Sequence, residues 1–117
     1  MKLTTSLMAI AAVTAGCASS TVPPPNDSLA SAVDTVRSAW NVGVKGDAVA
    51  EEHMRRAKSE IDRAIVLMRE GKNEEARHLL ARANVDAELA LELGRENVMQ
   101  RRAHDAEAVV ETARQGQ

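Results

Sequence analysis

The stretch that decides the fold is RAKSEIDRAIVLMREGKNEEARHLLARANVDAELAL, residues 56–91. Its apolar and small residues recur at alternating steps of four and three on both sides of a single turn, which is the spacing of a coiled-coil seam. Gly71 interrupts the pattern, and Asn73 then follows as a predicted N-cap with Glu74 and Glu75 in the first turn of the next helix. Because the turn is short, the two helices are predicted to be antiparallel neighbours.

The apolar seams of the two helices predict which residues face each other when they are paired residue by residue, starting at the turn. Ala64 then faces Leu80, and Ile61 faces Ala83. Most layers combine a large residue with a small one, which lets two helices approach closely and pack without voids. The predicted helix–helix seam consists of Met54, Ala57, Ile61, Ala64 and Met68 on one arm and Ala76, Leu80, Ala83, Ala87 and Ala90 on the other.

Helical patterns continue on both sides of this stretch, so the sequence predicts an all-α protein. The first hairpin arm is expected over residues 47–70 and the second over residues 73–114. A further helix is expected over residues 28–40, after the candidate N-caps Asn26, Asp27 and Ser28. The segment NVGVKGD, residues 41–47, carries two glycines and interrupts the helical pattern there.

The position of the helix over residues 28–40 distinguishes two architectures. In the favoured one it continues the arm over residues 47–70 through a kink, and the hairpin is long and coiled-coil-like. Its apolar residues then face the end of the second arm, in the pairs Ala39–Ala103, Val36–Ala106, Ala32–Val110 and Leu29–Ala113. The alternative is a three-helix bundle, which leaves the strip from Met99 to Ala113 bare and therefore implies a partner or a dimer.

Composition and motifs argue against several functions. The chain of 117 residues has one aromatic residue, Trp40, and a formal net charge of −2, so neither a basic patch nor base-stacking side chains support nucleic-acid binding. His53, His78 and His104 lie far apart without metal-ligand spacing, and no nucleophile motif or phosphate-binding loop occurs. We therefore expect no enzyme, no metal, no cofactor and no small-molecule substrate.

The N-terminus carries a second signal. Lys2 precedes an uncharged apolar run, and the small residues Ala15 and Gly16 stand before Cys17, the only cysteine in the chain. The segment VTAGC resembles a bacterial lipoprotein signal. That resemblance implies cleavage between Gly16 and Cys17 and a covalent acyl lipid on Cys17. The alternative is an ordinary secretory signal in which Cys17 is incidental.

These patterns divide the chain into four predicted parts. A signal peptide covers residues 1–16, and the lipidated cysteine with a proline-rich tether covers residues 17–27. The helical domain covers residues 28–114, and a disordered tail is expected over residues 115–117.

The hairpin also resembles a known family, the domain of unknown function numbered 4398. The resemblance implies an envelope lipoprotein without established catalytic activity. The matching positions are the alanines around a glycine-polar turn and the motif that follows them: Ala57, Ala64, Gly71, Ala76, Ala83, Asp86, Ala87, Leu89 and Ala90.

Together these observations predict a non-catalytic helical scaffold or protein-interaction module, held on the outer membrane by its lipid and facing the periplasm. Its partners would be the membrane and a protein or a second copy of the chain. EGKNEEARHLLARA, residues 70–83, also resembles half of a tetratricopeptide repeat, so a peptide-binding adaptor or assembly factor is the alternative. A second apolar stripe is either a broad core edge or a partner face; it comprises Ile65, Leu67, Leu79, Val85, Leu89 and Leu93.

Overall fold

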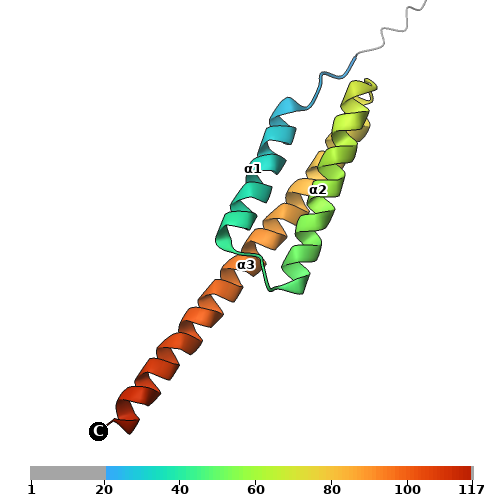
Figure 1. The fold of residues 1–117 in the computed structure, drawn as a ribbon. Helices are drawn as coiled ribbons and strands as arrows, with labels where there is room; N and C mark the ends of the chain where they lie inside the picture. The colour runs from blue at the N-terminus through green and yellow to red at the C-terminus, as the bar shows by residue number, and fades with distance from the viewer. Residues whose placement is uncertain (1–20, 117) are drawn as a thin grey trace, which may run out of the picture.

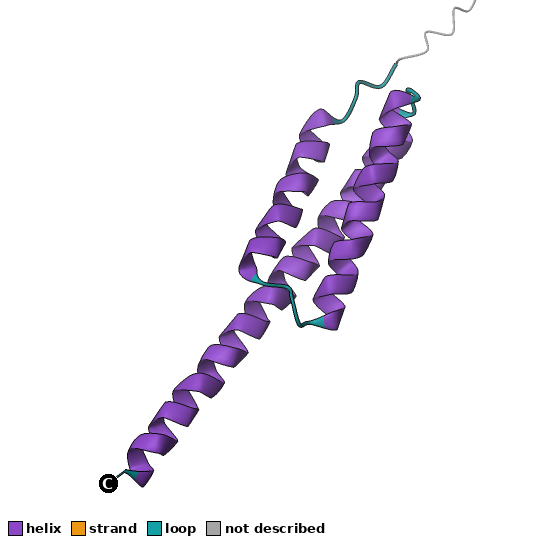
Figure 2. Ribbon diagram, viewed as in Figure 1, coloured by secondary structure: helices purple, strands orange, loops and turns teal. Residues whose placement is uncertain are grey.

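The computed structural model describes residues 21–116, and this part of the chain is helical without strands (Figure 1, Figure 2). Helix α1 spans Asn26–Val42, α2 spans Ala48–Arg69 and α3 spans Asn73–Gln115. The predicted all-α class is confirmed, and α2 with α3 forms the predicted antiparallel hairpin. Within residues 21–116, no helix combines the length and the apolar character that crossing a membrane requires.

The turn between α2 and α3 closes with a Schellman motif. The backbone N–H of Lys72 donates to the carbonyl of Leu67 at 2.9 Å, and the N–H of Gly71 donates to the carbonyl of Met68 at 3.1 Å. Gly71 has a φ of 76°, a backbone conformation that glycine adopts without strain. Lys72 Nζ lies 2.7 Å from the carboxylate of Glu70, and this hydrogen bond and charge raise the pKa of Lys72 above its ordinary value.

Two of the predicted helix caps are wrong. Helix α1 begins after Pro25, whose carbonyl accepts the N–H of Leu29, and no side chain caps it. Asn73 lies inside α3, and its side-chain amide donates to the carbonyl of Val22 at 2.6 Å. The amide of Asn73 therefore holds the segment before α1 against the α2–α3 turn. Asp47, in contrast, caps α2 by accepting the N–H groups of Val49 and Ala50.

Helix α1 packs beside the hairpin, so the protein is a three-helix bundle (Figure 1). The hydroxyls of Ser31 and Thr35 donate to Oδ1 of Asn84, at 3.3 and 3.2 Å, which places the middle of α1 against the first half of α3. The favoured prediction of one kinked arm is therefore wrong, and the alternative bundle is the observed arrangement. The chain reverses because Gly43 and Gly46 take φ values of 99° and 90°, which permit a tight loop where a kinked helix was expected.

The α1–α2 loop rests on α3 at a single small residue. Val44 at the centre of the loop is 1% exposed. A Cβ atom on Gly94 would lie 3.2 Å from Cγ1 of Val44 and 3.6 Å from Cγ1 of Val42. Gly94 therefore provides the space that lets the loop cross α3 and turn α1 back along it.

The core consists mainly of alanine, with a few larger side chains between the helices. One cluster, near the α2–α3 turn, joins Ala32 of α1 to Ile61, Ala64 and Leu80. The other, near the α1–α2 loop, joins Ala39 and Val44 to Met54 and Ala90. The residues of the predicted α2–α3 seam are all buried except Met68, which is half-buried against the first cluster.

Candidate interaction site

Helix α3 continues well past the end of the bundle (Figure 1). The residues of α1 and α2 that pack near the loop contact α3 around Ala90 and Gly94, and every residue from 99 to 116 is exposed. Apolar side chains are among them: Met99 is 64% exposed, Val109 is 68% exposed and Val110 is 51% exposed. We call residues 99–115 the α3 extension.

One face of the α3 extension is apolar along its whole length. Its residues follow one another at steps of four and three, so they line one side of the helix. The predicted cover from α1 is absent, because Ala32 and Ala39 are buried in the bundle instead. We call this face the exposed stripe; it consists of Met99, Ala103, Ala106, Val110 and Ala113.

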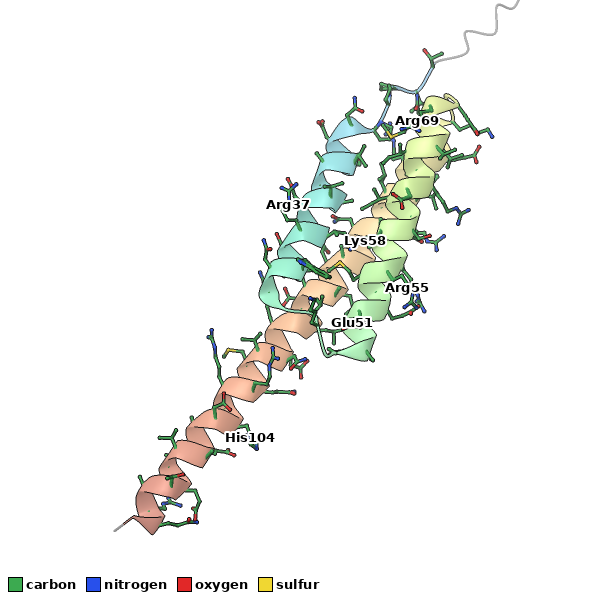
Figure 3. All side chains as sticks on the ribbon, viewed as in Figure 1. Arg37, Glu51, Arg55, Lys58, Arg69 and His104 are labelled. Atoms are coloured by element: carbon green, nitrogen blue, oxygen red, sulfur yellow. The ribbon has the colours of Figure 1, made fainter. Side chains whose placement is uncertain are left out.

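In the described part of the chain, the hydrogen bonds of the α3 extension lie within the helix. Its side chains, His104 among them, project from a helix with no other helix beside it (Figure 3). Gln100 donates to Glu96 at 3.0 Å, Gln115 donates to Glu111 at 2.8 Å, and the hydroxyl of Thr112 donates to a backbone carbonyl one turn earlier. The two side-chain pairs, Gln100–Glu96 and Gln115–Glu111, are of the kind that stabilises a helix by about 0.2–0.5 kcal/mol each. Most helical stability in proteins comes from packing of an amphipathic face, so a surface that covered the α3 extension would stabilise these last turns of α3.

The second apolar stripe of the sequence divides into two parts. Ile65, Leu67 and Leu79 are half-buried against the cluster near the α2–α3 turn, and Leu93 is half-buried against the other cluster. These four residues broaden the core. Val85 and Leu89 remain on the surface of α3, at 64% and 42% exposure.

The three histidines lie in separate places. His53 on α2 pairs through Nδ1 with Oδ1 of Asp86 on α3 at 2.7 Å, and this contact joins the two arms. His78 lies 3.6 Å from Glu74 on the first turns of α3, and His104 is exposed on the α3 extension. Among residues 21–116, no group of three His, Cys, Asp or Glu side chains is placed to hold a metal ion. Gly16 and Cys17 lie outside the described residues.

Trp40, the only aromatic residue of the chain, lies on the surface beside the α1–α2 loop. Its ring is half exposed, and the Nζ atoms of Lys45 and Lys58 each lie 5.1 Å from the ring centroid. Val44 and Met54 line the same hollow. Two cation–π contacts of about 0.5–1 kcal/mol each thus connect the loop and α2 to the end of α1.

An ion pair joins the two arms of the hairpin, between a buried carboxylate on α2 and an exposed arginine on α3. Glu60 is 7% exposed, and its Oε1 lies 2.6 Å from Nη2 of Arg82, whose side chain is mostly exposed. The second carboxylate oxygen, Oε2, is buried without a hydrogen-bond partner. Arg82 is therefore the one cation that compensates this buried charge in the described part of the chain.

Removing Arg82 is expected to destabilise the protein more than removing the whole pair. Arg82→Met should lower the free energy of unfolding by about 1–3 kcal/mol, because it leaves the Glu60 carboxylate buried and uncompensated. The double variant Glu60→Met, Arg82→Met should recover most of that loss, since two apolar side chains replace both charges. Urea unfolding followed by circular dichroism measures both. Equal losses in the single and double variants would contradict this account of the pair.

The sequence of the chain matches one known family. The family model described as "Domain of unknown function (DUF4398)" matches residues 27–106, which is more than half of the chain. The chain belongs to this family. The DUF4398 match covers α1, α2 and the first part of α3, and it ends inside the α3 extension at the centre of the exposed stripe. No curated protein and no solved structure matches the chain.

Proposed function

We propose that this DUF4398 protein is a lipid-anchored envelope lipoprotein that acts as a non-catalytic helical scaffold. Its bundle is the folded body, and the α3 extension is the element that contacts other molecules. The observation that carries the proposal is the exposed stripe, an apolar helix face that none of residues 21–116 covers. Exposed apolar strips of this kind mark interaction sites in soluble domains.

Two features of the chain support the anchored part of the proposal. The run before Cys17 has the order of a lipoprotein signal, and Cys17 is the only cysteine of the chain. In the described part, the segment before α1 is fixed beside the α2–α3 turn by the bond from Asn73 to Val22, whereas the α3 extension leaves the bundle at the opposite end (Figure 1). An anchor on the N-terminal side would therefore point the α3 extension away from the membrane.

The residue after the cysteine bears on the destination. Position 18 is alanine, whereas an aspartate there commonly signals retention in the inner membrane in lipoproteins of this class. The proposal therefore places the protein on the outer membrane, facing the periplasm.

Replacing Cys17 tests the anchor directly. The Cys17→Ser protein is expected to lose its membrane attachment and to leave the membrane fraction almost entirely, because no acyl chain can be attached to the serine. Fractionation of cells grown with labelled palmitate measures both attachment and acylation. Ser19→Ala, two residues further on, is the matched control and should remain acylated and membrane-bound. A Cys17→Ser protein that still fractionates with membranes and takes up label would refute the lipoprotein proposal.

A further inference from the structure

We propose that the exposed stripe pairs with the same stripe of a second copy of this chain, with the two α3 extensions antiparallel. The inference deepens the proposed function, on which it rests, by naming the partner of the α3 extension. It commits to a second copy because the residues of the stripe and of its flanks are complementary to themselves when one helix is reversed.

The first complementarity is one of size. When the helices are reversed about a centre near Ala108, Ala106 faces Val110 of the second copy, and Ala103 faces Ala113 of the second copy. Each layer then contains at most one valine, and the spacing between the helices stays even and close. Val109, which flanks the stripe, approaches Val109 of the second copy near the two-fold axis. This arrangement covers the two valines of the α3 extension, each of which is more than half exposed.

The second complementarity is one of charge. Glu107 and Arg114 occupy equivalent positions on one side of the stripe, one heptad apart. In the antiparallel pairing, Glu107 of each copy lies beside Arg114 of the other, which gives two interhelical ion pairs by symmetry. Both residues lie beside Ala106 and Val110 of the stripe on the surface of the α3 extension. A side chain of the second helix would insert between these residues.

The residues before the stripe favour the antiparallel direction over the parallel one. Glu92 and Glu96 are exposed and continue the heptad positions of the stripe towards the bundle. A parallel pair would place each of them opposite its own copy, which is a like-charge contact at core positions. It would also place Val110 opposite Val110 in one layer and Ala106 opposite Ala106 in the next. The distance between the two helix axes could then not be the same in both layers. The antiparallel pair avoids both and keeps the two bundles at opposite ends.

Two matched substitutions that each introduce a charge test which face of the helix forms the contact. Sedimentation of the Cys17→Ser protein over a concentration series should show a monomer–dimer equilibrium. Ala106→Glu, on the stripe, should raise the dissociation constant more than tenfold, because it buries a charge in the dimer seam. Ala108→Glu, on the opposite face of the same helix turn, should change it less than twofold. A protein that stays monomeric at all concentrations, or equal effects of the two variants, would overturn the proposal.

A charge exchange tests the flanking pairs. Glu107→Arg and Arg114→Glu should each weaken the dimer about three- to fivefold, since each turns two attractive contacts into repulsive ones. Combining them should restore the original dissociation constant, because the pairs return with reversed sign. A double variant as weak as the sum of both single changes would overturn the assignment of these pairs.

Disulfide trapping tests the direction. With Cys17 replaced by serine, the only cysteines are those introduced. Mixing Ala106→Cys and Val110→Cys chains under mild oxidation should give mainly the mixed dimer, because facing seam positions lie within reach of a disulfide. Ala106→Cys chains that link efficiently to one another would show a parallel pair and overturn the orientation. If dimers fail to form while wild-type protein remains acylated and membrane-bound, the further inference falls and the anchored scaffold does not.

Discussion

Replacing Leu80 with alanine is expected to lower the free energy of unfolding by about 2–5 kcal/mol, the range for removing a fully buried leucine. Leu80 and Val44 are the largest fully buried side chains among residues 21–116. Leu80 lies where α1, α2 and α3 meet, in one cluster with Ala32, Ile61 and Ala64. Larger side chains such as Leu29 and Met68 pack only at the edge of this cluster, so we expect part of the resulting cavity to remain. Stability on the order of 5–15 kcal/mol is usual for small domains, so this loss is a large fraction of the total.

The control for Leu80→Ala is Val66→Ala, which shortens a half-exposed side chain on α2. That change should cost within about 0.5 kcal/mol, because surface substitutions away from special features are usually near neutral. Urea unfolding at low protein concentration, followed by circular dichroism, measures both variants. Similar losses in the two would contradict a core centred on Leu80.

Replacing Gly94 with leucine is expected to destabilise the protein by about 1–3 kcal/mol, the usual range for overpacking a filled interior. Even a Cβ atom at this position would lie 3.2 Å from Cγ1 of Val44, so a leucine must displace the α1–α2 loop. The effect should also reach α1, since the loop fixes its position against α3. Thermal unfolding gives the loss, and hydrogen exchange of α1 amides should rise with it.

Val44→Ala provides the partner for a double-mutant cycle with Gly94→Leu. Shortening Val44 removes the atom that a new side chain would meet first, so the double variant should lose less than the two single variants together. Strict additivity would show that Gly94 and Val44 do not act on each other, and the account of the loop crossing would then fail.

The hairpin follows from sequence because its signals are local. The alternating steps of four and three fix which face of each helix is apolar, and Gly71 fixes where one helix ends. The predicted bounds of α2 and α3 lie within one residue of the observed ones. Helix caps were harder to predict, because the side chain of an asparagine such as Asn73 can donate a hydrogen bond to a carbonyl far away in the sequence. Only folding brings the carbonyl of Val22 beside Asn73.

Whether a single polar or aromatic residue is exposed or buried could also not be predicted from the sequence. Trp40 has the spacing of a core residue, yet its ring lies on the surface between Lys45 and Lys58. Glu60 has the charge of a surface residue, yet it is buried against Arg82. In both cases the deciding factor is how neighbouring helices close around the position, and residue type alone does not carry that information.

The sequence by itself determined an all-α chain with a small-residue hairpin and a helix before it, because helical periodicity and turn residues act within a few positions of one another. The tertiary structure alone decided where that first helix lies. Its apolar face could have packed against either half of α3. Helical periodicity shows which face of a helix is apolar, but it does not show which other helix packs against that face. Gly43 and Gly46 allow the chain to reverse, and Gly94 leaves space for Val44, so α1 joins the bundle. The exposed stripe is the consequence, because α1 does not reach this part of α3 and its apolar face stays exposed.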